Sequence, residues 1–260
     1  MESMAASESA ERGALEARLG AVRIVLVQPS HPGNIGSAAR AMLTMGLSEL
    51  VLVAPERFPD VEATTLAAGA DAVLERAQVV GGLDAAIGEC RLVLGCTARQ
   101  RGVRLPEMHP REAAARLLDP AAHGPVALLF GRERTGLTND ELQRCHGAVH
   151  IPANPGFSSL NLAAAVQVLS YELRGAALGG APVPTRPARD LPATEAEMEG
   201  MFEHLAQALD DIDFHKGRSP RTVLRRLRRL LLRAAPDQRE VRILRGMFTE
   251  AQRMARLARR

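Results

Sequence analysis

From Val22 onward, short apolar runs alternate with stretches whose apolar residues recur at helical spacing. The run Val22–Gln28 is rich in β-branched residues and apolar at nearly every position, so both of its faces suit a hydrophobic environment. Strands of this kind, separated by helices, are typical of a parallel sheet covered on both faces. The sequence therefore predicts an α/β fold with a parallel sheet, with strands at 22–28, 50–53, 92–96, 126–130 and 149–151. We expect its helices at 34–45, 110–118, 139–145 and 160–177.

A Pro- and Gly-rich stretch at 179–193 separates this α/β region from a region whose pattern is helical throughout. Capping-box pairs predict helix starts at Thr138 and Thr194, each with Glu three residues later. Ser219 followed by proline predicts a further helix start. We therefore expect four segments: a flexible leader at 1–20, an α/β domain at 21–178, a linker at 179–193 and a small helical domain at 194–260.

Positive charge is concentrated at the end of the chain. Residues 216–260 carry 15 basic and three acidic residues, a net charge of +12, whereas the whole chain carries +3. A basic tail on an acidic body is typical of proteins that bind nucleic acid. In the helix expected at 219–234, one apolar stripe contains Val223, Leu224, Leu227, Leu230 and Leu231. We predict that the helical domain binds the RNA backbone through Lys216, Arg218, Arg225, Arg226, Arg228 and Arg229.

Several classes of protein are disfavoured. The first 20 residues have no apolar run, and no later run is long enough to cross a membrane, so we expect a cytoplasmic protein with no membrane partner. Three cysteines without a CxxC pair, and histidines without ligand spacing, predict no metal site. A P-loop is excluded because Lys216 is the only lysine. Aromatic residues make up only 3% of the chain, which argues against a base-stacking sheet.

Three loops that follow predicted strands are rich in Gly, Asn, Ser or Arg: 30–36, 131–137 and 151–161. A fourth and weaker one is 97–99. Ligands in open α/β sheets bind at the carboxyl ends of the strands, so these loops are the candidate site. Each loop taken alone is equally well explained by turns and helix caps.

Together, in this order, the loops carry a more specific pattern. Asn34 is followed six residues later by Arg40, Gly131 lies two residues before Glu133, and 159–161 reads Ser-Leu-Asn at a helix start. This pattern resembles the three motifs of the knotted SPOUT methyltransferases, in the TrmH-like branch that methylates ribose. The segments SHPGNIGSAARAM, FGRERTGLTNDEL and SSLNLAAAVQV are similar to TrmJ-like members.

The resemblance implies a trefoil-knotted α/β domain that acts as a homodimer. It also implies S-adenosylmethionine as the methyl donor and tRNA as the substrate, with transfer to the 2′-hydroxyl of C or U at nucleotide 32. The catalytic residues would be Arg40, Ser159, Asn34 and Glu133. The cofactor-binding residues would be Thr97, Ala98, Arg99, Gly131, Ile151, Ser159, Leu160 and Asn161.

A guanidinium is normally always protonated, so Arg40 is an unusual candidate for a general base. Either Arg40 is deprotonated beside the cofactor, or it holds a neighbouring phosphate while the proton leaves to water. Three other functions stay open at this point: methylation of another tRNA or rRNA nucleotide, RNA binding without catalysis, and DNA binding by the basic helices.

Overall fold

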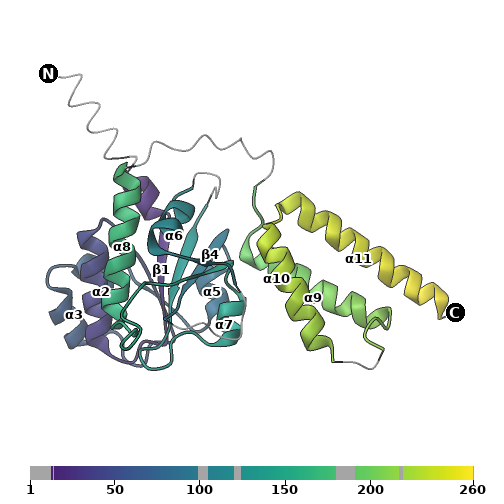
Figure 1. Cartoon of the computed structure of the whole chain (residues 1–260), viewed down its shortest axis with the longest axis horizontal. Helices are drawn as coiled ribbons and strands as arrows, with labels where there is room; N and C mark the ends of the chain where they lie inside the picture. Colours follow the sequence, from purple (N-terminus) through teal and green to yellow (C-terminus); the bar gives the residue numbers. More distant parts are fainter. Residues whose placement is uncertain are drawn as a thin grey trace, which may run out of the picture. The chain divides into compact units, whose positions relative to one another are not determined.

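The computed structural model describes residues 13, 15–98, 105–119, 124–179, 191–216 and 219–259 of the chain (Figure 1). The chain divides into two compact units, Met1–Arg186 and Pro187–Arg260. The division falls inside the predicted linker 179–193, most of which lies outside the described residues, as do most of the leader and the candidate residues Arg99 and Arg218.

The described part of unit 1 is built on a seven-stranded sheet in which every pairing is parallel. Its strand order is β3-β2-β1-β6-β4-β7-β5. The strands are β1 (Val22–Val27), β2 (Glu49–Val53), β3 (Gln78–Val80), β4 (Leu92–Cys96), β5 (Glu107–Met108), β6 (Val126–Phe130) and β7 (Gly147–Val149). The predicted parallel α/β fold is confirmed.

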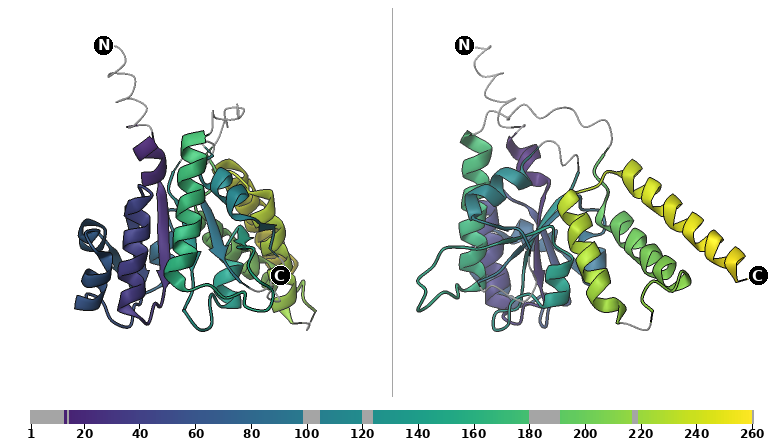
Figure 2. Two further views of the ribbon diagram at one scale, coloured as in Figure 1. Left: turned by 60° about the vertical axis from the view of Figure 1, so that its left-hand side comes forward. Right: turned by 45° about the vertical axis from the view of Figure 1, so that its right-hand side comes forward.

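Both faces of this sheet are covered. Ile24 and Leu26 of β1 face one cluster of buried side chains, and Val25 and Val27 face another. The first cluster lies under α2 (Pro32–Thr44), α3 (Val61–Ala67), α4 (Asp71–Glu75), α6 (Pro110–Leu117) and α8 (Leu162–Gly179). The second lies under α5 (Leu83–Ile87) and α7 (Asn139–Gln143). Helices α2 and α8 run side by side on the first face (Figure 2). The nearly continuous apolar pattern of β1, β2, β4 and β6 is therefore explained by the burial of these strands from both sides.

Four of the five predicted strands, β1, β2, β4 and β6, are confirmed to within one residue. The prediction at 149–151 is wrong, because β7 ends at Val149 and the residues after it form a loop. The predicted helices are confirmed to within two residues as α2, α6, α7 and α8. Helix α2 is followed by Gly46 at φ +83°, a left-handed conformation that ends helices and suits glycine.

The trefoil knot depends on how loops after the strands pass one another. One of these loops includes residues 99–104, which lie outside the described residues. The knot therefore stays a prediction.

The described part of unit 2 contains α9 (Glu195–Asp211), α10 (Pro220–Ala234) and α11 (Gln238–Ala258). Capping boxes begin α7, α9 and α11, and those at Thr138 and Thr194 were predicted. The core of the unit consists of side chains from all three helices, with Met201, Leu232 and Val241 among the most buried. An all-helical second unit is thus confirmed.

One part of the predicted stripe in α10 is wrong. Leu224, Leu227 and Leu231 pack against the core as expected, but Leu230 is 50% exposed. Leu232, which was not in the prediction, is buried instead. The buried side of the helix is therefore rotated toward position 232, whose side chain is part of the core that α10 shares with α9 and α11.

Candidate active site

The candidate loops follow four strands that are neighbours in the sheet, β1, β6, β4 and β7. All four strands are parallel, so their carboxyl ends lie at the same edge. This topology brings segments from positions 28–40, 97–98, 131–137 and 150–161 to one place, although they are far apart in the sequence.

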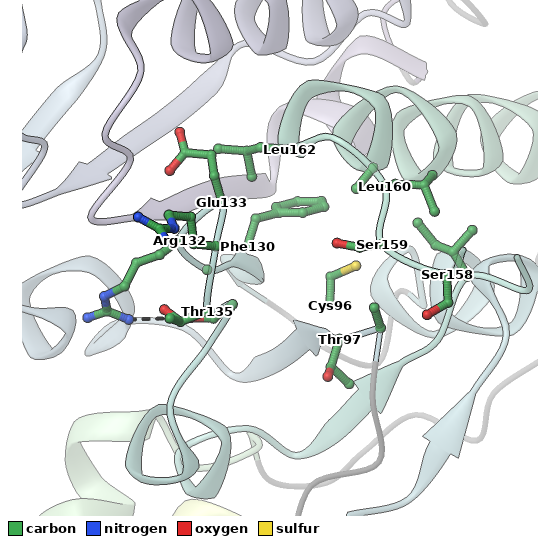
Figure 3. A pocket seen from close by; sticks show the side chains of 16 residues that line it. Cys96, Thr97, Phe130, Arg132, Glu133, Thr135, Ser158, Ser159, Leu160 and Leu162 are labelled. Atoms are coloured by element: carbon green, nitrogen blue, oxygen red, sulfur yellow. Dashed lines mark hydrogen bonds between the residues drawn. The ribbon is translucent and has the colours of Figure 1, made fainter. Parts of the chain in front are cut away.

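A cavity of about 320 Å³ lies at this edge (Figure 3). Of the predicted cofactor residues, those that line it are Thr97, Ala98, Gly131, Ile151, Ser159 and Leu160. Its apolar walls include Phe130 and Leu162, and hydroxyl groups come from Thr135 and Ser158. A volume of this size, with apolar side chains and polar groups on its walls, is typical of small-molecule sites.

The carboxylate of Glu133 holds the loop that precedes α2. It accepts hydrogen bonds from the backbone N–H of Ser30 at 3.1 Å, from that of His31 at 3.2 Å and from Nδ2 of Asn34 at 3.1 Å. Partial burial by itself raises the pKa of this carboxyl, but the hydrogen bonds from Asn34, Ser30 and His31 outweigh it and lower the pKa to about 2. Glu133 is therefore ionised at neutral pH and can only accept hydrogen bonds.

An ionised Glu133 determines the orientation of two asparagine amides in series. Because its oxygens accept, Asn34 must turn its NH2 group toward Glu133 and its Oδ1 away. That Oδ1 accepts a hydrogen bond from Nδ2 of Asn161 at 2.9 Å. The Oδ1 of Asn161 then accepts from the backbone N–H of Ala163, at 2.9 Å, at the start of α8. A single hydrogen-bond chain of fixed polarity thus links all three motif loops.

The loop after β6 is closed by its own contacts. A Cβ atom added to Gly131 would lie 2.1 Å from the backbone carbon of Gly136, so no other residue fits there. Arg132 donates to both carboxylate oxygens of Glu141, each at 3.0 Å, and its Nε donates to Gln28. Arg132 therefore holds the loop in place, and its charge is neutralised within the protein.

Not every predicted site residue lies at the cavity. Asn34 and Asn161 lie beside it, in the hydrogen-bond chain. Arg40 is exposed on α2 and is not among the residues that line the cavity.

The sequence interpretation also missed cavity residues. Cys96 and Phe130 are the last residues of predicted strands, and that position is the signal that could have identified them. Burial raises the pKa of the Cys96 thiol to about 12, so this residue is neutral in the cavity wall.

The predicted RNA-binding residues in unit 2 divide into two groups. Lys216, Arg225, Arg226 and Arg229 are exposed. Arg228 is half-buried, forms an ion pair with Glu199 and lies over the ring of Phe202 at 4.5 Å from its centre. Arg228 therefore stabilises the helical unit. Only the four exposed residues stay candidates for contact with RNA.

Comparison with known proteins gives the family. The model of the SpoU rRNA methylase family matches residues 21–171, and that of the C-terminal domain of the tRNA methyltransferase TrmJ matches residues 196–260. The chain is 50% identical over 248 residues to the tRNA (cytidine/uridine/adenosine-2′-O-)-methyltransferase TrmJ of Pseudomonas aeruginosa, covering 92% of this chain and 96% of that protein. The chain belongs to the SpoU methylase family, in its TrmJ group. A second TrmJ relative, from Sodalis glossinidius, is 50% identical over 88% of this chain and 90% of its own length.

Solved structures of similar proteins agree with this family assignment. TrmJ from Z. mobilis ZM4 superposes with a TM-score of 0.75 at 38% identity, covering 88% of this chain and 97% of that one. A probable methylase family protein from Haemophilus influenzae Rd KW20 superposes with a TM-score of 0.60 at 41% identity, covering 92% and 99%. The two units of the chain thus correspond to the two parts that TrmJ-group SpoU methylases combine.

Two further findings concern the described residues of this SpoU methylase. They contain no group of three or more His, Cys, Asp or Glu side chains that could hold a metal ion. Among them, no helix is long and apolar enough to pass through a membrane.

Proposed function

We propose that this chain is an S-adenosylmethionine-dependent tRNA 2′-O-ribose methyltransferase that acts on C or U at nucleotide 32 of the anticodon loop. The observation that carries the proposal is the cavity at the carboxyl edge of the sheet. The loops after β6 and β7, which carry two of the three motifs, form its walls, and the hydroxyl of Ser159 lies among them. The third motif loop, before α2, lies beside the cavity and is held there by Glu133.

The cavity suits the methyl donor. Phe130, Ile151, Leu160 and Leu162 provide apolar walls for an adenosyl group, and hydroxyls and backbone groups between them provide hydrogen-bond partners. Arg132, which also lines it, is already ion-paired with Glu141, and the carboxylate of Glu133 already accepts hydrogen bonds from the loop before α2. A bound donor would supply an electrophilic methyl group on a sulfonium, so the protein needs to bind it and aim it, without supplying a metal or a nucleophile of its own.

The protein must also position a ribose hydroxyl in line with that methyl group. Ser159 is exposed at the cavity, so its hydroxyl can orient the acceptor oxygen. Arg40 either accepts the proton of the hydroxyl, if it is deprotonated beside the donor, or holds the adjacent phosphate as a cation while the proton leaves to water. Glu133 and Asn34 act through the loop that they hold, as positioning residues.

The site is completed, in this proposal, by a second copy of the chain. Arg40 is exposed on α2 and lies outside the cavity of its own subunit. Exposed apolar residues also lie on the paired helices α2 and α8: Leu43 at 42%, Tyr171 at 62% and Leu178 at 64%. A homodimer that buries this face would bring Arg40 of one subunit to the cavity of the other.

Mixed dimers test this arrangement. Arg40→Ala and Ser159→Ala homodimers are each expected to be inactive, and Arg40→Ala is expected to keep its affinity for S-adenosylmethionine in calorimetry. If the two residues act across the interface, each mixed dimer of the two variants has one intact site and one site that lacks both residues. Half of the dimers in an equal mixture are mixed, so the mixture regains up to about a quarter of wild-type activity. No recovery in proven mixed dimers would place Arg40 in its own subunit's site.

The helical unit is proposed to hold the tRNA backbone through Lys216, Arg225, Arg226 and Arg229, which are exposed. Arginine contacts with phosphate give affinity that falls steeply with salt. The described cysteines form no disulfide with one another, which supports a reducing cytoplasmic location, where tRNA is modified.

The deciding experiment incubates the purified protein with labelled S-adenosylmethionine and unmodified tRNA transcripts, and maps methyl groups by nuclease digestion and mass spectrometry. We expect one 2′-O-methyl group at nucleotide 32. A methyl group at another nucleotide would overturn the assigned position, and methylation of rRNA alone would overturn the substrate. Donor binding without transfer to any tRNA would point to rRNA as the substrate or to a missing partner.

A further inference from the structure

A second, more open hollow of about 830 Å³ adjoins the donor cavity. The two share three wall residues, Ile151, Ser159 and Leu160. Its other sides include His109 and Arg111 at the start of α6, and Phe157 in the loop after β7. None of these last three residues belongs to the motifs from which the site was predicted.

A reaction that transfers a group between two substrates requires two adjoining sites, and these two hollows adjoin at Ile151, Ser159 and Leu160. The donor and the acceptor must meet at van der Waals distance, so their sites must adjoin, with the orienting group at the boundary. Ser159, the proposed orienting residue, lies at this boundary and is exposed. The hollow on its far side is therefore the place from which an acceptor oxygen can approach.

The chemistry of the hollow matches a nucleotide. Phe157 is 82% exposed, so its ring offers an apolar face to a partner and would lose that exposure on binding. The ring is carried on a hydrogen-bonded turn, in which Asn154 accepts from the backbone N–H of Gly156 at 3.0 Å and of Phe157 at 2.9 Å. The exposed Arg111 and His109 provide cationic or hydrogen-bonding groups on the other side.

Resting on the function proposed above, we propose that this hollow receives the nucleotide that is methylated, with Phe157 stacking on its unstacked base and Arg111 contacting a flanking phosphate. Stacking of one base on an aromatic side chain is tolerant of base identity, because every base has a π-face. The site would therefore hold a flipped-out pyrimidine or purine, and the reaction would be directed by the ribose and the tRNA shape.

The chain has no tryptophan, so a Phe157→Trp variant is a single-tryptophan protein whose fluorescence reports on this position alone. Wild-type protein is first used to map the methylated nucleotide, which tests the proposed function separately. A transcript with the normal base there is expected to quench the fluorescence of Phe157→Trp, and a transcript lacking only that base is expected not to. Val79→Trp, on the exposed strand β3 at the far edge of the sheet, is the control and should respond to neither.

Phe157→Ala gives the kinetic test. Loss of a stacked base predicts that kcat/KM for tRNA falls about fivefold or more, while the affinity for S-adenosylmethionine in calorimetry stays within twofold of wild type. Phe157→Trp should keep kcat/KM near wild type, which a purely steric role would not allow.

The proposal is overturned by equal quenching with both transcripts, or by an unchanged kcat/KM in Phe157→Ala. It is also overturned if Phe157→Ala becomes monomeric in light scattering, because the hollow then belongs to a second copy. Absence of methylation by wild-type protein would instead refute the proposed function.

Discussion

The substitution Glu133→Gln tests whether an ionised carboxylate holds the motif loops together. The pKa of Glu133 is about 2, against an ordinary value of 4.5. At about 1.36 kcal/mol per pKa unit, this difference sets an upper limit of about 3.4 kcal/mol on the contribution of ionisation to stability. Part of the side chain faces solvent, and screening reduces the expected value to about 1–2 kcal/mol.

Because the pKa of Glu133 is lowered in the folded protein, its ionisation stabilises the fold at neutral pH and not in acid. A carboxyl whose pKa is lower in the folded state stabilises the fold above pH 4.5, and this contribution is lost as the pH falls toward 2. Glutamine keeps one acceptor oxygen but places an NH2 group opposite the N–H donors of the loop, and it no longer determines the orientation of Asn34. We therefore expect a lower free energy of unfolding at pH 7 and weaker binding of S-adenosylmethionine.

Urea unfolding at pH 7 and pH 3, followed through the β-sheet signal in circular dichroism, measures the effect in unit 1. The difference between wild type and Glu133→Gln should be about 1–2 kcal/mol at pH 7 and should shrink by about half at pH 3, because the unfolded carboxyl is then protonated. Glu75→Gln, an exposed site on α4, is the control. A difference that is the same at both pH values would refute the role of the charge.

Three further substitutions test the packing and the RNA contacts. Gly131→Ala should destabilise unit 1 by about 3 kcal/mol in urea unfolding, because its Cβ would lie 2.1 Å from backbone atoms; a normal stability would mean that the loop can move. Leu232→Ala should cost about 2–4 kcal/mol and Leu230→Ala less than about 0.5 kcal/mol, and equal losses would contradict the observed rotation of α10. Replacing Arg225 and Arg229 together by Gln should lower the slope of log K against log salt for tRNA by about 1.4–1.8, and an unchanged slope would remove them from the interface.

The sheet could be predicted from the sequence wherever a strand is buried on both faces. Runs such as 22–27 and 126–130 have a nearly unbroken apolar pattern, which turns and helices do not share. Strands β3 and β5 were missed because they have three and two residues, and β3 is largely exposed at the edge of the sheet. Helices α3, α4 and α5 have only five to seven residues, too few to show a period.

The location of the site could also be predicted, because loops after parallel strands lie at one edge. The hydrogen-bond and ion-pair partners within the site could not be predicted. Arg132 lies in the candidate loop 131–137, and it pairs with Glu141, which the sequence identified only as part of a helix cap. The bonds from Asn34 to Glu133 and from Asn161 to Asn34 span 99 and 127 residues. Such pairings depend on the strand order, which no local pattern contains.

The hydrogen-bond chain explains why these three motif side chains need to occur together. A chain of amides has two possible directions, and only an obligate acceptor at one end and obligate donors at the other select one of them. Glu133 is that acceptor, and the free N–H groups at the start of α8 are the donors. Asn161 is two residues from Ser159, so the same chain restricts the hydroxyl at the boundary between the two hollows. In the proposed function, the geometry of methyl transfer therefore depends on a carboxylate that orients the loops around the donor and the acceptor.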